Sequence, residues 1–307
     1  MTHFCCPGPV FRRAFLLVCL FPFFVSCASA PGAKDQAPEK DLLFLPPGAS
    51  VYMHIDVARA RPILDLLSIG ALRGGDIPEI LDRTDSAAAA LYPEGSGRRF
   101  FVAARGKYPR FRSGLSFAFS SLWKKRRSPA GGSYWYSTGH KMGVSIGAGR
   151  AFLSDQDPLA VSPEIQSPGG FGALSRGALL AGWLPGAASQ INTFFAARNI
   201  PLQIPAEQVL FSIHPSPPED GEGGKYELTL YLETPSESHA QGLAAIISMM
   251  RFFMADALEP GDPLKALTDL FTRPPLRAGT NLILRSPGWD EREIALLFNM
   301  FALYFRY

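Results

Sequence analysis

The chain repeats a pattern of predicted strands and helices at intervals of about 129 residues, and this repeat constrains the fold more than any other feature. Three landmarks recur: an apolar strand after Gly48 and Gly177, a Gly-Leu pair at Gly114 and Gly242, and a closing strand from Ala151 and Asn281. The spacings are 129, 128 and 130 residues. A near-constant spacing is typical of a duplicated unit, although the two halves share little identity and a chance match of patterns is the alternative.

Each half has the predicted order β-α-β-β-α-β, which is the split βαβ order. The predicted strands lie at 51–56, 87–92, 100–104 and 151–154 in the first half and at 179–184, 209–214, 226–233 and 281–285 in the second. A helix follows the first strand of each half, and the Gly-Leu pair opens a second helix. The sequence therefore predicts an α+β fold of two units, 46–168 and 169–307, that are able to share one sheet. The first unit has an extra hairpin near Tyr134–Ile146.

The N-terminus has the pattern of an export signal. Arg12 and Arg13 precede an apolar run from Ala14 to Val25, which is short enough for a signal peptide and too short to span a bilayer. Phe24-Val25-Ser26-Cys27 resembles a bacterial lipobox of the relaxed, spirochaete type, since Phe24 replaces the usual leucine. Cleavage after Ala30 is the alternative, but it places Pro31 just after the cut.

The resemblance to bacterial lipoproteins implies residues 1–26 as signal peptide and acyl chains on Cys27. It also implies export and anchoring to a membrane, with the outer membrane, facing the periplasm, as the expected location. Residues 27–45 are predicted to be the lipidated cysteine and a flexible tether, because 28–41 is small, polar and proline-containing. The other cysteines are Cys5, Cys6 and Cys19, so the mature chain has no second cysteine for a disulfide.

Residues that carry chemistry are sparse. The histidines have no HExxH spacing or clustered partners, so no metal site and no cofactor are predicted. Gly143-Val144-Ser145-Ile146-Gly147 matches G-x-S-x-G, but a nucleophile elbow needs a helix directly after the serine. A glycine-rich hairpin is predicted there instead. A hydrolase that uses Ser145 is the third-ranked function, and we expect no enzyme.

The charge distribution is the main indication of function. No acidic residue lies between Glu94 and Asp155, and that stretch contains 12 lysines and arginines among many aromatic residues. The predicted lipid-binding residues of this segment are Arg98, Arg99, Lys107, Arg110, Arg112, Trp123, Lys124, Lys125, Arg126 and Arg127. Lys124–Arg127 is predicted to be an exposed loop. An exported protein meets anionic phospholipid and not nucleic acid, and a solvated basic surface is the alternative.

Two predicted helices, 242–258 and 291–307, are apolar nearly all round. Such helices are buried either in protein or at a lipid interface. Phe298, Phe301 and Phe305 are the lipid-contacting candidates of the second helix. The sequence thus predicts a lipid-anchored, non-enzymatic envelope protein whose body engages membrane phospholipid. A structural module that binds another envelope protein is the alternative.

Replacement of the anchor residue tests the predicted export route. Cys27→Ala is expected to give unacylated precursor or a soluble product, because only a cysteine accepts the lipid. Metabolic labelling with a radioactive fatty acid measures this, and unchanged incorporation in the variant would contradict the assignment.

Overall fold

The computed structural model describes residues 38–66, 81–93, 95–160, 165–197, 203–216, 226–254, 270 and 272–304. The helices of this part are α2 (Pro38–Leu42), α3 (Val57–Leu66), α5 (Arg110–Phe119), α6 (Phe171–Ser175), α7 (Ala187–Ala197), α8 (Glu237–Met254) and α10 (Glu291–Tyr304). The strands before α6 are β1 (Val51–Asp56), β2 (Thr84–Leu91), β3 (Phe100–Gly106), β4 (Trp123–Arg127), β5 (Ser133–Ser137), β6 (Met142–Ile146) and β7 (Arg150–Ser154). Those after it are β8 (Leu180–Pro185), β9 (Gln208–Pro215), β10 (Tyr226–Glu233), β11 (Leu276–Ala278) and β12 (Asn281–Arg285).

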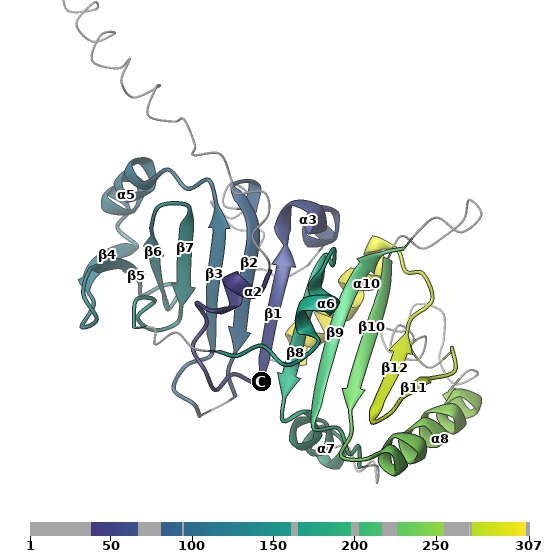
Figure 1. Cartoon of the computed structure of the whole chain (residues 1–307). Coiled ribbons are helices and arrows are strands. Elements are labelled where there is room, and N and C mark those ends of the chain that lie inside the picture. Colours follow the sequence, from purple (N-terminus) through teal and green to yellow (C-terminus); the bar gives the residue numbers. More distant parts are fainter. Residues whose placement is uncertain are drawn as a thin grey trace, which may run out of the picture.

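All twelve of these strands form one antiparallel sheet in the order β11-β12-β10-β9-β8-β1-β2-β3-β7-β6-β5-β4 (Figure 1). The first strands of the two halves, β1 and β8, pair at its centre. From there β2, β3 and β7 follow on one side, and β9, β10 and β12 follow in the matching order on the other. The predicted α+β class and the shared sheet are confirmed. The duplication itself, and the division at residues 168 and 169, stay predictions.

The region between α5 and β7 differs from its counterpart in the second half. The extra hairpin predicted near Tyr134–Ile146 is present as β5 and β6. A further strand, β4, precedes it and forms the outer edge of the sheet. The prediction of a loop at Lys124–Arg127 is wrong, because these residues pair along their whole length with β5.

Two other local predictions need correction. Gly114 and Gly242 do not open their helices: α5 begins at Arg110 and α8 at Glu237. The predicted tether of 27–45 is also too long. Residues 38–42 form α2, and Leu42 and Leu45 are buried in the core, so any tether is restricted to residues before 38. In the sequence, the apolar residues Leu42 and Leu45 are the evidence that the tether ends before them.

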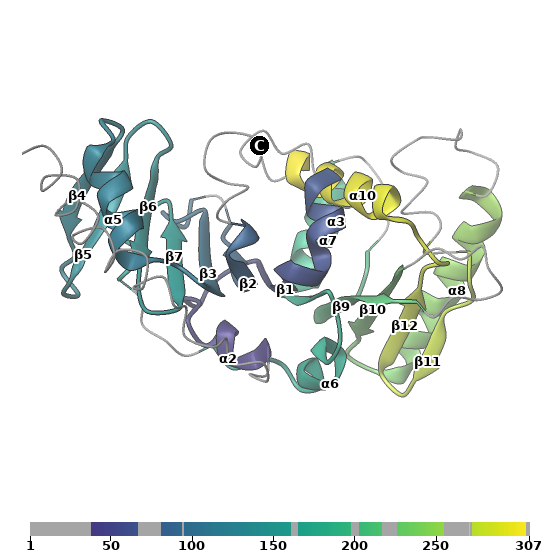
Figure 2. The ribbon, with the colours of Figure 1, turned by 90° about the horizontal axis from the view of Figure 1, so that it is seen from above.

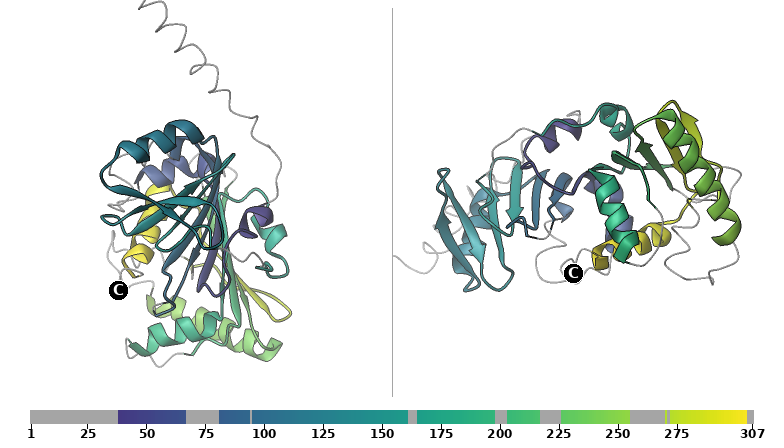
Figure 3. Two further views of the ribbon diagram at one scale, coloured as in Figure 1. Left: turned by 90° about the vertical axis from the view of Figure 1, so that its left-hand side faces the viewer. Right: turned by 90° about the horizontal axis from the view of Figure 1, so that it is seen from below.

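The helices cover both faces of the curved sheet (Figures 2 and 3). α2 and α6 lie on one face, and α3, α7 and α10 lie on the other. Successive side chains of each strand point to opposite faces of the sheet, so one strand contributes apolar residues to the contacts with both groups of helices. In β10, for example, Leu228 and Leu232 pack under the second group of helices, whereas Tyr231 contacts the core beneath α2 and α6.

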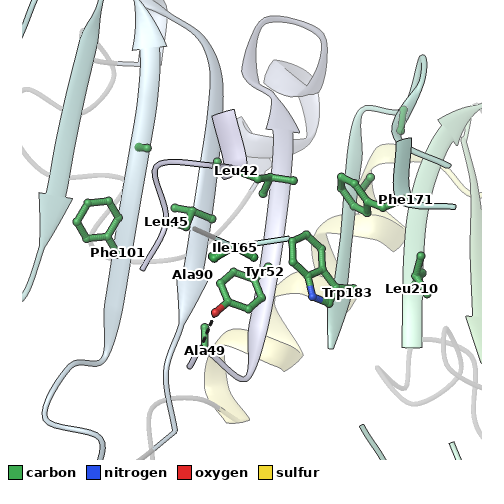
Figure 4. Packing of buried hydrophobic residues seen from close by; sticks show 14 residues of the cluster. Leu42, Leu45, Ala49, Tyr52, Ala90, Phe101, Ile165, Phe171, Trp183 and Leu210 are labelled. Carbon is green, nitrogen blue, oxygen red and sulfur yellow. Dashed lines mark hydrogen bonds between the residues drawn. The ribbon is translucent and has the colours of Figure 1, made fainter. Parts of the chain in front are cut away.

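The core at the junction of the halves is built on aromatic residues (Figure 4). The rings of Tyr52 on β1 and Trp183 on β8 stack with centroids 4.8 Å apart. Phe171 of α6 meets the Trp183 ring edge-on at 5.0 Å. The hydroxyl of Tyr52 accepts the amide proton of Ala49 at 3.0 Å and donates to the Pro46 carbonyl at 3.2 Å. The chain after α2 is thereby held against the junction.

The C-terminal helix α10 packs against α3. Ile294 and Ala295 are buried with Ile63 in one cluster, and Phe298 packs against that cluster. Leu296, in contrast, is 44% exposed. One face of this apolar helix is therefore protein core. Within the described residues, none of the helices meets the length and apolarity needed to cross a bilayer.

A pair of Gly→Ala substitutions tests the tightness of the central sheet. A Cβ at Gly182 of β8 would lie 2.4 Å from the Tyr52 carbonyl oxygen and 2.5 Å from Cζ of Phe211. Gly182→Ala should therefore destabilise the protein by about 2 kcal/mol, as overpacked cores do. At exposed Gly242 in α8 nothing lies within 4 Å, so Gly242→Ala should stabilise by roughly 0.5–1 kcal/mol. Urea unfolding measures both, and equal effects would contradict the packing described.

Candidate functional site

Four consecutive exposed basic residues lie on the edge strand β4. Trp123–Arg127 pairs with β5 on one side only, and all four cations of the strand are exposed. Lysines and arginines are common on free sheet edges because their charge opposes uncontrolled strand addition. Charge on this strand is therefore compatible with a solvated edge as well as with a binding surface, and other features must distinguish the two.

Aromatic rings of β5 hold the long side chains of two of these cations. The Nζ of Lys125 lies 6.0 Å from the centroid of the Trp135 ring, and Cζ of Arg126 lies 3.9 Å from that of Tyr136. Cation–π contacts of this kind leave the charged groups able to bind anions. Within the part of the chain that the structure describes, no carboxylate lies within ion-pair distance of any cation in Lys124–Arg127. Their charge is not neutralised locally.

Exposed apolar side chains lie directly before this strand. Phe117 is turned inward, with its ring 4.9 Å from that of Trp123 and 5.8 Å from that of Trp135. Phe119, at the end of α5, is 86% exposed, and Leu122 is 55% exposed. These two exposed apolar side chains are close in the chain to cations that have no carboxylate partner among the described residues, and that combination makes this region the candidate binding surface. We call Phe119, Leu122 and Lys124–Arg127 the basic edge.

The other predicted lipid-binding residues do not all join this surface. Arg98 is partly buried: its guanidinium lies over the rings of Tyr92 and Phe101, and it donates to the Ala160 carbonyl. Arg98 is thus a packing residue. Arg99 and Lys107 are exposed, at opposite ends of β3.

Of the candidates on α10, Phe298 packs against the core beneath the helix. Several other candidates cannot be placed. The side chains of Arg110, Arg112 and Phe301, together with Phe305 and Cys27, lie outside the described residues. Sequence analysis missed Phe119 and Leu122 as candidates, because an apolar residue at a helix end gives no indication of its exposure.

The residues of the G-x-S-x-G match lie on a hairpin, as the sequence predicts. Ser145 is on β6, and Gly147–Gly149 turns the chain into β7. The helix that a nucleophile elbow requires is replaced by a strand. Among the described residues, no cluster of His, Cys, Asp and Glu has the composition to hold a metal ion.

A buried polar cluster joins α2 to the sheet. Oδ2 of Asp41 accepts a hydrogen bond from Ser86 Oγ at 2.9 Å and lies 3.3 Å from Arg105 Nη2. His54 Nε2 lies 3.5 Å from the same oxygen. The histidine thus faces the aspartate and not the serine, and all three are nearly inaccessible. This cluster does not form a nucleophile and base pair, and its role is to fix α2.

Ionised Asp41 is the favoured form in this cluster. Burial on its own raises the pKa of the carboxyl group. The contacts from His54 and Ser86 and the charge of Arg105 outweigh burial, and the pKa lies below its ordinary value of 3.8.

The fold and the basic edge define a class: a two-unit α+β protein with one continuous sheet and a charged, partly apolar edge. A family model described as "Outer membrane-associated lipoprotein TP0453" matches residues 36–152, from before α2 into β7. This description is consistent with a spirochaete-type lipoprotein and with the predicted outer-membrane localisation. It names a membrane-associated protein and no enzymatic activity.

Solved structures of TP0453 have the same fold. Crystal form III has a TM-score of 0.56 at 17% identity over 89% of this chain and 99% of that chain. Crystal form IV has a TM-score of 0.57 at 18% identity over 84% of this chain and 96% of that chain. At this identity the similarity establishes the fold alone. No curated protein matches the sequence.

Removal of the Asp41 charge tests the buried cluster. Asp41→Asn leaves Arg105 and His54 without their anion, so we expect a loss of about 3 kcal/mol in unfolding free energy at pH 7. Because the folded pKa of Asp41 is depressed, the charge stabilises the wild type above the unfolded value near 4, and this stability is lost as pH falls through the folded pKa. The difference in unfolding free energy between wild type and variant should therefore become smaller toward pH 2.

Denaturant titrations at pH 7 and at low pH measure that difference. Asp65→Asn is the matched control, since Asp65 is 57% exposed and paired only with Arg61 at the surface. An Asp41 variant as mildly affected as the control would contradict a stabilising role for the cluster.

Proposed function

We propose that this chain is a lipid-anchored, non-enzymatic protein of the outer membrane whose folded body engages anionic lipid through the basic edge. One observation carries the proposal: Phe119 and Leu122 are exposed directly beside four cations that have no carboxylate partner among the described residues. Cations attract an anionic surface, and apolar side chains enter its interface. A merely solvated strand needs the charge but gains nothing from an exposed phenylalanine.

The expected energies are sufficient for a weak contact that assists an acyl anchor. Each lysine or arginine near an anionic surface contributes about 1 kcal/mol, so the four cations contribute roughly 4 kcal/mol. This part fades as salt shortens the Debye length from about 10 Å at 0.1 M to about 3 Å at 1 M. Phe119 and Leu122 add an apolar contribution to the binding free energy, which salt does not screen.

The position of the basic edge allows both contacts to reach one membrane. Ten residues lie between Cys27 and Pro38, and the eleven Cα–Cα steps of a fully extended chain span at most about 40 Å. α2 packs on β3, and β4 is four strands farther along the sheet. At ~4.8 Å per strand this separation is ~19 Å. An acylated Cys27 and the basic edge are therefore within reach of the same leaflet.

The alternative is a structural module that binds another envelope protein. The free side of β4 favours it, because the unpaired backbone groups of an edge strand are able to pair with a strand of a partner. The charge of β4 would select an acidic partner. Lipid binding by the isolated protein separates the two functions, since the alternative does not require it.

A vesicle assay tests the proposal. The chain beginning at Ala28 retains every described residue and has no acyl chain. We expect it to bind anionic vesicles at low salt, and replacement of all four cations of Lys124–Arg127 by serine should remove the salt-sensitive part. Phe119→Ser should weaken the salt-resistant part by about 1–2 kcal/mol without changing Tm, since the side chain is exposed.

Leu276→Ser is the matched control for Phe119→Ser. Leu276 is 52% exposed on β11, at the opposite edge of the sheet, and its loss should leave vesicle binding unchanged. If the wild type ignores anionic vesicles even at low salt, the proposal fails and the protein-binding alternative replaces it.

A further inference from the structure

An open hollow of about 500 Å³ lies beside the basic edge, on the α2 side of the sheet. Arg99, Arg126, Tyr136, Thr138, Lys141 and Asp155 line it. These residues come from five places in the chain: the approach to β3, the edge strand β4, the strand β5, the turn between β5 and β6, and the segment after β7. The sheet thus brings three cations from distant segments to one depression.

The single carboxylate of the hollow does not neutralise it. Asp155 accepts the backbone amide protons of Arg99 at 2.9 Å and of Phe100 at 3.4 Å, and it is only 11% exposed. Arg99 Nε lies 3.9 Å from it, at the outer limit of an ion pair. Arg126 and Lys141 have no carboxylate partner among the described residues. The formal charge of the hollow is therefore +2.

The backbone at Lys141 is strained. Its φ of 50° is the only positive value of a non-glycine residue in the described chain. Glycine adopts this conformation without cost, and a lysine does not. Strained positions cluster at binding sites, and this one supplies a cation to the hollow.

The shape and the charge both suit a phosphate group. The guanidinium of Arg126 is held over the Tyr136 ring, and a fixed planar fork binds phosphate through two parallel hydrogen bonds. Thr138 adds a hydroxyl. A phosphate monoester carries a charge of about −1.5 to −2 at pH 7, which matches +2, whereas a phosphodiester carries only one charge.

We propose that this hollow binds the phosphate monoester of a lipid headgroup. The inference rests on the proposed function and adds to it a specific headgroup class. The lipid source follows from the proposed membrane function of the basic edge, because β4 supplies both Arg126 of the hollow and the other cations of that edge.

The experiment compares two anionic lipids with the chain beginning at Ala28. Vesicles containing phosphatidic acid, a monoester, are matched in surface charge to vesicles containing phosphatidylglycerol, a diester. We expect the wild type to prefer phosphatidic acid by about fivefold, the effect of one additional charge contact. Lys141→Gly should abolish this preference, leave binding to phosphatidylglycerol nearly unchanged and raise Tm, because it relieves the strain.

Lys107→Ser is the matched control. It removes one exposed cation of the same segment outside the hollow, and it should preserve the preference for the monoester. Arg99→Gln provides a second variant within the hollow and should weaken the preference as Lys141→Gly does. Calorimetric titration with glycerol 3-phosphate tests the same chemistry without a membrane.

The outcomes separate the two proposals. Equal binding to the two lipids, or an unchanged preference in Lys141→Gly, overturns the phosphate site while the proposed membrane function stands. Binding to neither vesicle overturns the membrane function. If glycerol 3-phosphate then binds in a Lys141-dependent manner, the hollow is a phosphate site for a soluble ligand and the lipid assignment is wrong.

Discussion

The antiparallel pairing of β1 with β8 is the contact on which the rest of the structure depends. Neither half has a closed sheet of its own, so each leaves a strand edge that must be paired or covered. Pairing the two first strands satisfies both edges and creates one surface for the helices of each face. The stacked rings of Tyr52 and Trp183 lie across this junction, and α2 and α6 cover it. The helix α2 and the chain directly after it are therefore part of the centre of the protein and not of its margin.

Joining the halves at their first strands moves the remaining edges to the ends of the sheet. One end is the short strand β11, and the other is β4, with four cations in five residues. Among the described residues, the strands β4, β5 and β6 extend the sheet of the first half and no corresponding strands extend that of the second. The first half, which carries the basic edge, also holds α2 through Asp41 and its partners.

Local chemistry explains which predictions of the site were accurate. The concentration of cations between residues 94 and 155 is a property of composition, and their exposure on β4 agrees with it. Whether an individual cation is free depends on its neighbours, as Arg98 shows by packing over two rings. The same holds for apolar residues. Phe298 packs against core and Phe119 is exposed, although both are phenylalanines of amphipathic helices.

The sequence by itself determined the β-α-β-β-α-β order within each half, because strand alternation and helical periodicity are local patterns, whereas α2, α6, β4 and β11 were not predicted. It also determined the lipobox-like residues around Cys27 and the acid-free segment. Tertiary structure alone decided which helix face is core, where α2 begins to pack, and how Arg99, Arg126 and Lys141 come together. These features depend on strand register and on contacts between segments tens of residues apart. Local patterns carry no information about such contacts, since the free energy that fixes them arises only when the whole sheet has formed.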